Sequence, residues 1–217
     1  MTAGNLIVLG VSCYGYDISS VTDSLGNTYT LIDNVRDTPN DSPGATYYAK
    51  NITGGACTIT VSMTGSNYYQ RVIAVEYSGL DTTAPLDVHT AVNDTTVSTT
   101  TDSASSGSTG TTSAADSLVF GYIGPTQAGS ITAGTGFTSI ANEQGCLAEE
   151  SNAASTGTYE ATGTGDMTTR VVAFVAVFKP AAGGGGGGGG TPSAPPQIRQ
   201  LFHRSYRPRP YAPGRGR

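Results

Sequence analysis

Acidic and histidine side chains are the groups in this chain that could act in catalysis, and their spacing does not form a known catalytic set. His89, in PLDVHT, is the only histidine apart from one near the C-terminus. A zinc site or a Ser–His pair needs further ligands or partners, and no Cys or second His lies near it in the sequence. Glu149 and Glu150 are adjacent, so in a strand they point to opposite faces and cannot pair as the carboxylates of a glycosidase do. Glu149 could converge in space with Glu76 or Glu160, but the sequence does not place them. We therefore predict that the chain is not an enzyme and uses no cofactor.

The acidic loop at residues 33–41 (DNVRDTPND) could bind a hard cation through its oxygens. It lacks the D-x-[DN]-x-[DN]-G spacing of a calcium loop, and Asp, Asn and Pro are also residues that form turns. We therefore expect a turn here and no metal site.

Tyrosines close to this loop are better candidates for binding. Two follow the first predicted strand and two precede a later one, and alternating strand directions bring them to one end of the fold together with the acidic loop. Tyrosine rings flanked by Asp and Asn can stack on a sugar ring or anchor a protein contact. Tyrosine is also a common aromatic residue of exposed β-loops, and the chain has no tryptophan to favour sugar binding. The candidate ligand-binding residues are Tyr14, Tyr16, Asp37, Asp41, Tyr68 and Tyr69.

Basic residues gather at the C-terminal end. All 16 acidic residues precede Pro180, so the body has a net charge of −11 and the tail one of +6. An acidic body repels nucleic acid and anionic lipid. The tail is a solubilising or docking segment, and nucleic acid, a membrane surface and an acidic protein are its alternative partners. Its arginines are Arg199, Arg204, Arg207, Arg209, Arg215 and Arg217.

Three cysteines, Cys13, Cys57 and Cys146, form no CxxC motif, and their odd number leaves at least one free thiol. We favour three structural thiols, with one disulfide as the alternative. The N-terminus lacks a basic segment followed by a long apolar core, so we recognise no signal peptide. We expect either export by another route or a mature, truncated or virion-packaged chain. The apolar runs are too short to span a bilayer, so we expect no transmembrane segment.

The elements that must position these residues are β-strands, and the series of strands occurs twice. Each block is a run of apolar or β-branched residues bounded by Gly, Asn or Ser. The offset between the copies is 112 at Leu6/Leu118, 108 at Tyr29/Phe137 and 99 at Arg71/Arg170. The blocks AGNLIVLGVS, GNTYTLID, YYAKN, ACTITVSMTG and QRVIAVEYSG return in order as AADSLVFGYIG, TGFTSIAN, LAEESN, GTYEATGTG and TRVVAFVAVFK.

This pattern predicts an all-β fold, a two-sheet antiparallel β-sandwich of jelly-roll type built from an internal duplication with six strands in each half. Alternation along the strands predicts a shared inner face. Its expected members are Leu6, Val8, Val72, Ala74, Leu118, Phe120, Val172 and Phe174.

We expect one sandwich domain at residues 1–180, followed by segments of different composition. The glycine run behaves as a flexible coil, and the tail has too little apolar surface to fold, so we expect it to be disordered. The predicted parts are halves at about 3–92 and 114–180, a Thr/Ser-rich crossover at about 95–113, a Gly/Pro linker at 181–196 and an Arg/Pro-rich tail at 197–217.

The series AGNLIVLGVS, VTDSLGNTYT, YYAKN, EYSGLDTTAPLDV, GFTSI and VAVFK resembles a poorly characterised β-sandwich module that recurs in bacterial secreted and cell-surface proteins and in phage-derived sequences. The resemblance covers roughly residues 3–180 and implies the fold. Its motifs are structural, so it implies no catalytic residue.

These observations favour a non-enzymatic structural or adhesive module that is extracellular, at the cell surface or in a virion. The expected partner is a protein or a surface glycan, and self-assembly is a further alternative. The competing hypothesis is a carbohydrate-binding accessory domain that uses the tyrosine-bearing end.

Overall fold

The computed structural model describes residues 1–37, 42–65, 70–94, 102–125, 128–143, 145–167, 171–182 and 199–203. These residues form antiparallel β-strands and no helix, so the predicted all-β fold is confirmed. With no helix among the described residues, none of them forms a helix that could cross a membrane.

Two five-stranded sheets form the centre of the molecule. The first central sheet has the order β15-β6-β1-β4-β3, and the second has the order β11-β12-β9-β14-β7. The first contains β1 (Leu6–Ser12), β3 (Thr30–Asp37), β4 (Ser42–Ala49), β6 (Arg71–Tyr77) and β15 (Arg199–His203). The second contains β7 (Leu86–Asp94), β9 (Ser117–Pro125), β11 (Thr138–Glu143), β12 (Cys146–Ala153) and β14 (Val171–Phe178).

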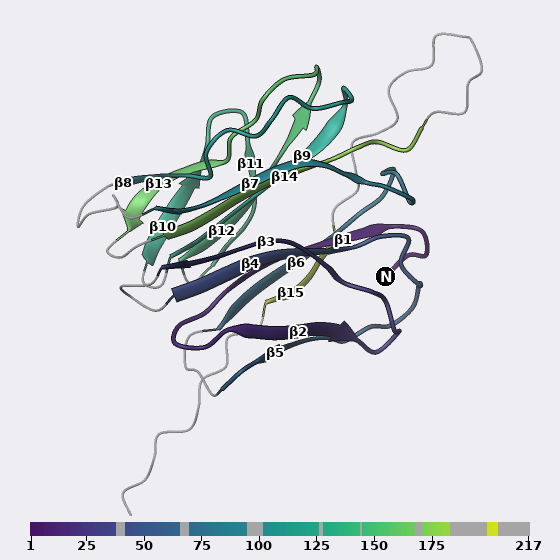
Figure 1. The fold of residues 1–217 in the computed structure, drawn as a ribbon, viewed down its shortest axis with the longest axis horizontal. Coiled ribbons are helices and arrows are strands. Elements are labelled where there is room, and N and C mark those ends of the chain that lie inside the picture. The colour runs from purple at the N-terminus through teal and green to yellow at the C-terminus, as the bar shows by residue number, and fades with distance from the viewer. Residues whose placement is uncertain are drawn as a thin grey trace, which may run out of the picture.

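Two smaller sheets cover the outer faces of the central pair, so the strands lie in four layers (Figure 1). One outer sheet pairs β2 (Ile18–Asp23) with β5 (Ile59–Met63), and the other has the order β10-β13-β8, with β10 (Ala128–Ala133), β13 (Thr162–Met167) and β8 (Asp102–Ser105). The middle strands of the central sheets are thus buried on both faces, whereas the edge strands β3, β7 and β11 keep exposed residues. This explains why β1 and β14 are buried along their whole length and are almost entirely apolar.

The central core lies between the two five-stranded sheets and contains most of the predicted inner face. Leu6 and Val8 of β1 face it, as do residues of β9 and β14. Val72 and Ala74 were predicted there, and this was wrong. They pack on the outer side of β6, and the residues of β6 that face the central core are Ile73, Val75 and Tyr77. The register explains the difference, because it places Val75 opposite Val8 and Tyr77 opposite Leu6.

The two halves have the same strand order. The series β6-β1-β4-β3 of the first central sheet is repeated as β14-β9-β12-β11 in the second, and the outer pair β2-β5 is repeated as β10-β13. The bulge in the β3–β4 pairing, between Leu31 and Asp33, recurs between Ser139 and Ala141 in the β11–β12 pairing. The predicted internal repeat is therefore present in the pairing pattern as well as in the sequence.

The register changes one detail of the repeat. Leu6 lies opposite Tyr77, and its counterpart Leu118 lies opposite Phe178. Tyr77 and Phe178 are therefore equivalent, which is an offset of 101 in the last strand instead of the predicted 99. The difference of two residues leaves every side chain on the same face.

Contacts between the central sheets follow the same symmetry. Tyr48 of the first half packs edge-on against Phe178 of the second, with ring centroids 5.9 Å apart. The equivalent pair is Glu150 with Tyr77, and burial together with the Glu150 carboxylate raises the pKa of Tyr77 well above its usual range. The two sheets thus pack on each other through equivalent positions of the repeat.

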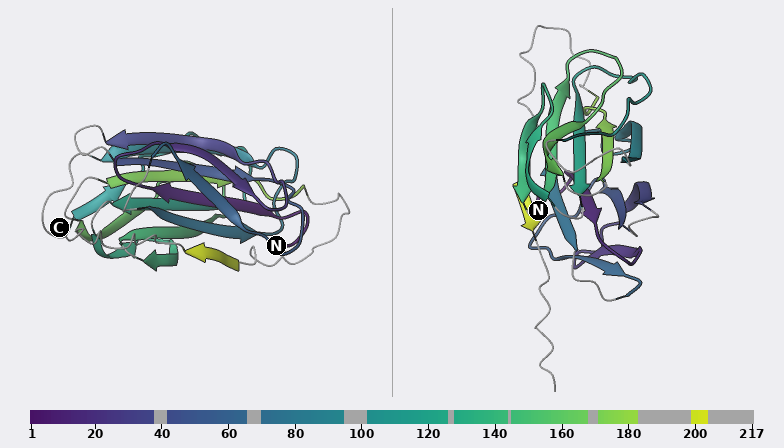
Figure 2. Two further views of the ribbon diagram at one scale, coloured as in Figure 1. Left: turned by 90° about the horizontal axis from the view of Figure 1, so that it is seen from below. Right: turned by 90° about the vertical axis from the view of Figure 1, so that its left-hand side faces the viewer.

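Strand β7 connects the halves, because it follows β6 along the chain but pairs with β14 in the second central sheet. The residues predicted as a crossover include β8, which pairs with β13, whereas residues 95–101 lie outside the described residues. Of the predicted tail the structure describes residues 199–203 alone. They form β15 at the edge of the sandwich (yellow in Figure 2).

A glycine and a tyrosine meet at the middle of the central interface. Gly10 in β1 and Tyr122 in β9 are equivalent residues of the repeat, and a Cβ at Gly10 would overlap the Tyr122 ring. The Tyr122 hydroxyl donates to Ser12 Oγ at 2.9 Å, and both of these oxygens lie 3.5 Å from Cys146 Sγ. The ring and its buried hydroxyl therefore join the two halves at one point.

We expect Gly10→Ala to lower the free energy of unfolding by about 1–3 kcal/mol, because the new methyl group must displace a ring fixed on all sides. Chemical denaturation of the variant measures this. Gly157→Ala is the matched control, because a Cβ there would only make ordinary contact with Tyr159, 3.9 Å away. Equal stability of wild type and Gly10→Ala would contradict the packing described here.

Candidate functional site

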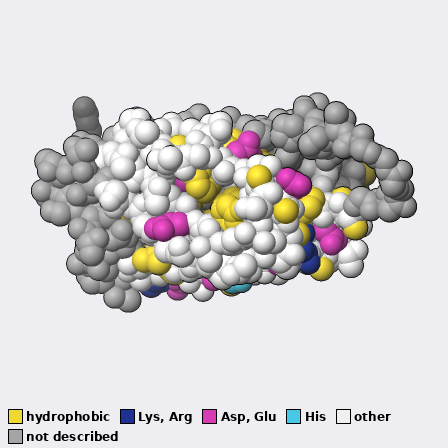
Figure 3. Space-filling view, turned by 90° about the horizontal axis from the view of Figure 1, so that it is seen from above, with side chains coloured by type: hydrophobic (Ala, Val, Ile, Leu, Met, Phe, Trp, Pro, Cys, Tyr) yellow, Lys and Arg dark blue, Asp and Glu magenta, His cyan; other side chains and the backbone are white. Residues whose placement is uncertain are grey.

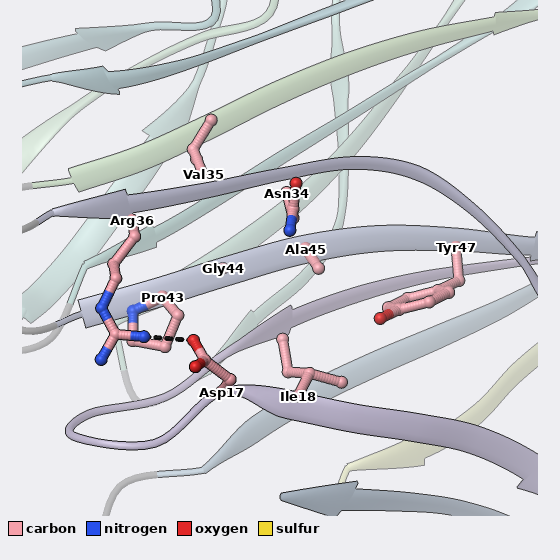
Figure 4. A pocket seen from close by; sticks show the side chains of 9 residues that line it. All are labelled: Asp17, Ile18, Asn34, Val35, Arg36, Pro43, Gly44, Ala45 and Tyr47. Atoms are coloured by element: carbon pink, nitrogen blue, oxygen red, sulfur yellow. Dashed lines mark hydrogen bonds and ion pairs between the residues drawn. The ribbon is translucent and has the colours of Figure 1, made fainter. Parts of the chain in front are cut away.

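A pocket of about 180 Å³ opens at one end of the first half, between β2 and the β3–β4 part of the first central sheet (Figure 4). Its wall combines an ion pair, an amide, a phenol and several small apolar groups. The lining residues are Asp17, Ile18, Asn34, Val35, Arg36, Pro43, Gly44, Ala45 and Tyr47.

The second half fills the corresponding place. Asn34 lies opposite Ala45, and the equivalent pair in the second half is Asn142 and Leu147. The Asn142 side chain bonds to the backbone N–H and C=O of Ile131 in β10, and Leu147 is buried in the outer core beside Ile131. Ala45 is much smaller than Leu147, and no described bond ties Asn34 to β2. The space that Leu147 and Asn142 close in the second half thus stays open in the first.

Tyr47 lines the pocket on the side away from the ion pair of Asp17 and Arg36, with its hydroxyl turned toward Ile18 (Figure 4). Burial raises the pKa of its hydroxyl, and the nearby Cys13 thiol adds to the shift. The hydroxyl therefore stays protonated at neutral pH and can both donate and accept a hydrogen bond. Its equivalent in the second half is Glu149, because Tyr47 pairs with Leu9 and Glu149 with Gly121 at matching positions.

An ion pair lies at the mouth of the pocket. Asp17, just before β2, bonds to Arg36 near the end of β3, and the two side chains are 63% and 34% exposed. Their charged groups remain accessible to a ligand from solvent. A carboxylate and a guanidinium held together offer both acceptors and donors, which is the chemistry that recognises hydroxyl-rich or zwitterionic groups.

The loop before β2 holds two tyrosines at the surface beside this mouth. The Cys13 thiol donates to the carbonyl oxygens of Tyr16 and Pro43, at 3.1 and 3.7 Å, and Gly15 adopts a φ of 84°, so the loop turns back sharply. Tyr14 is 49% exposed and Tyr16 is 41% exposed, and they are among the most exposed large apolar residues of the described chain.

The Tyr16 ring covers the backbone of Gly65, where any Cβ would overlap it. One face of this ring thus rests on the protein, and the residue is directly followed by Asp17 of the pocket. The predicted tyrosines Tyr14 and Tyr16 therefore lie at the same end of the first half as the pocket.

Other predicted residues are only partly described. Asp37 ends β3, and only its backbone is described, whereas Asp41, Tyr68 and Tyr69 lie outside the described residues. In the tail, Arg199 lies in β15, opposite Glu76, and the other five arginines lie outside the described residues.

Sequence reasoning did not identify Asn34, Arg36 and Tyr47 as site residues. Once the strand pairing fixes which residues correspond, comparing the two copies identifies Tyr47, whose counterpart is Glu149, and Ala45, whose counterpart is Leu147. It does not identify Asn34, because its counterpart is also an asparagine, Asn142.

His89 has a partner that the sequence did not reveal. Its Nδ1 lies 2.5 Å from Asp33 Oδ2, and the pair joins β7 to β3 across the edge of the sandwich.

Among the residues that the structure describes, no group of three or more His, Cys, Asp and Glu could hold a metal ion. The three cysteines form no disulfide in the structure, with Cys13 and Cys146 buried and Cys57 partly buried.

The glutamates considered for catalysis lie in separate environments. Glu76 is bound by the Thr2 N–H and the Asn5 side chain, both at 2.7 Å, and Glu160 accepts a bond from Ser105 at the surface. Glu150 faces the central core, whereas Glu149 faces the outer core of the second half. The predicted opposite orientation of Glu149 and Glu150 is confirmed, and none of the four glutamates lines the pocket described above.

Glu149 is fully buried and is the most perturbed carboxyl group described. One oxygen accepts a bond from the Gly134 N–H at 2.8 Å, and the other has no hydrogen-bond partner among the described residues. Burial raises the pKa of Glu149 to about 7, and backbone bonds from Gly134 and Thr162 oppose the shift. The carboxyl group is thus largely protonated below neutral pH and supports the outer core in its neutral form.

Comparison of the chain with protein-family models, curated proteins and solved structures finds no match.

Stability should depend on pH through Glu149. Because its pKa in the folded state, about 7, exceeds the ordinary value of 4.5, its stabilising contribution is complete below pH 4.5 and is lost as pH rises to 7. Glu149→Gln mimics the neutral form. As pH rises from 4.5 to about 7, the free energy of unfolding of this variant minus that of the wild type should therefore increase by at most about 1.4 kcal/mol per pH unit. Denaturation at several pH values measures the difference.

Glu160→Gln is the control for this experiment, because Glu160 is exposed. It should leave the pH profile of the wild type unchanged. Parallel profiles for wild type and Glu149→Gln would contradict the neutral, buried state.

Proposed function

We propose that this chain is a non-enzymatic structural or adhesive module of an extracellular, cell-surface or virion assembly, and that it contacts its partner through the pocket-bearing end of the first half. The observation that supports this is the combination of the pocket with two exposed tyrosines at the place where the two copies differ. A module that presents one surface on a rigid scaffold needs no catalytic group.

The rest of the molecule suits a scaffold. The second half repeats the strand order of the first, but the place that corresponds to the pocket is filled by Leu147 and by Asn142 bonded to β10. The four layers bury both faces of the middle strands of each central sheet, and such close packing resists deformation. The outer face over β8, β10 and β13 is mostly neutral, with scattered apolar and acidic side chains (Figure 3).

Charge narrows the class of partner. The chain up to Pro180 has a net charge of −11, so a polyanion would be repelled at most approaches to the body. A neutral glycan or a protein surface suits this body better.

Carbohydrate binding is the second candidate, and the pocket's chemistry favours it. Asp17, Asn34 and Tyr47 supply acceptors and donors for hydroxyl groups, and the Tyr16 ring beside them offers a flat face for a sugar ring. The volume of about 180 Å³ is below that of drug-sized pockets, so it suits a single small group such as one terminal sugar unit.

The test is binding to a glycan array and to candidate surface proteins, followed by variants of the site. We expect Tyr16→Ala and Asn34→Ala each to weaken binding at least about tenfold, because a few central residues dominate recognition. Their thermal midpoints should stay close to that of the wild type, since exposed residues add little to stability.

Val92→Ala is the matched control, because Val92 is also a large exposed apolar residue, 36% exposed, and lies on β7 of the other central sheet. It should leave binding unchanged. Binding of a glycan would support the second candidate, binding of a protein alone would support the first, and binding that survives both site variants would refute the assignment of this end.

A further inference from the structure

Strand β15 occupies a position that the repeat assigns to a seventh strand. In the first half, β7 follows β6 and pairs with β14 of the second central sheet. In the second half, β15 follows β14 and pairs with β6 of the first central sheet. Both pairings are antiparallel and extend the sheet beyond equivalent strands. Each half thus donates its last strand to the other half's sheet.

The registers of the two pairings agree. Ile73 and Phe174 are equivalent, because they lie opposite Gly10 and Tyr122. In the second sheet Phe174 pairs with Ala91 of β7, and in the first Ile73 pairs with His203 of β15. Each pairing is interrupted by one bulge.

Without β15, the backbone groups along the outer edge of β6 would have no partner strand. Its residues from Val72 to Val75 are all apolar, and its other edge is paired with β1. A long apolar strand with unpaired backbone groups tends to pair with another chain. The equivalent edge of β14 is covered by β7, which is joined to β6 by a short connection of residues 78–85.

The Glu76 carboxyl group adds a specific chemical requirement. It is 1% exposed, one oxygen is bound by Thr2 and Asn5, and the other has no hydrogen-bond partner among the described residues. A buried carboxylate oxygen without a donor is costly. The register puts Arg199 directly opposite Glu76, so the segment that covers this edge brings a basic residue to this position.

The connection to β15 is long, and its composition suits reversible docking. It spans residues 179–198 and includes eight consecutive glycines, Gly183–Gly190. The entropy lost on closing a loop grows only with the logarithm of its length, so such a connection still permits docking. The composition of the glycine run predicts a flexible coil, and on that prediction we expect the strand to be able to leave and return.

We propose that the edge of β6 is a docking site for one extended segment, and that its occupant is residues 199–203 of the same chain, which act as a detachable seventh strand of the first central sheet. Docking uses main-chain hydrogen bonds, as in strand addition to an open sheet edge, with Arg199 opposite Glu76 setting the register.

Hydrogen exchange on the full chain tests this. Gln200→Pro combined with Leu201→Pro removes two successive backbone N–H groups, so at least one bond to β6 is lost whichever of them faces it. We expect exchange of amides in the peptide covering 71–77 to become at least about tenfold faster, while the peptide covering 171–178 is unchanged. Gly187→Pro with Gly188→Pro is the matched control and should leave both peptides unchanged.

A synthetic peptide of residues 197–206 should restore protection of β6 when added to the strand variant, and a peptide of the same composition in permuted order should not. Equal protection of β6 in wild type and strand variant, or equal rescue by the permuted peptide, would overturn the proposal. A wild-type dimer that becomes monomeric in the strand variant would show that the strand comes from a second copy, and would overturn its assignment to the same chain.

Discussion

The packing of Tyr122 over Gly10 is the contact on which the arrangement of the two halves depends. β1 and β9 are the middle strands of the two central sheets, and the missing side chain at Gly10 gives the ring its place between them. The hydroxyl of this buried ring needs a partner, and Ser12 of the other half supplies it at 2.9 Å. Because one half provides the ring and the other provides the space and the hydrogen bond, neither copy completes this core alone.

Burial of both faces of the middle strands follows from that interface and from the outer sheets. A strand with two covered faces has no polar side, so β14 is apolar throughout, which is unusual for antiparallel strands. Strand exchange also holds the two halves together, because β7 of the first half extends the central sheet of the second. The Asp33–His89 pair joins the neighbouring edges of the two sheets where β3 and β7 meet.

The sequence predicted the strands and their repetition because apolar blocks and turn residues report local structure directly. It placed Val72 and Ala74 on the wrong face, since alternation has no meaning in a strand whose two faces are both apolar. It separated Glu149 from Glu150 correctly, because opposite orientation of neighbours is a property of any strand. It did not pair His89 with Asp33, because that contact depends on how two sheets are joined and not on local pattern.

The pocket could not be predicted from the sequence, because it depends on the small size of one side chain, Ala45. Ala45 leaves open the space that Leu147 fills in the second half, and Asn34 lacks the bonds that tie Asn142 to β10. Neither difference is visible until the pairing shows which residues correspond. The two copies share their strand order and are therefore subject to the same packing requirement. The fold alone thus does not explain why one copy leaves this space open. A binding role at this place is what we propose, and this is why the functional proposal rests on the first half and not on the symmetric core.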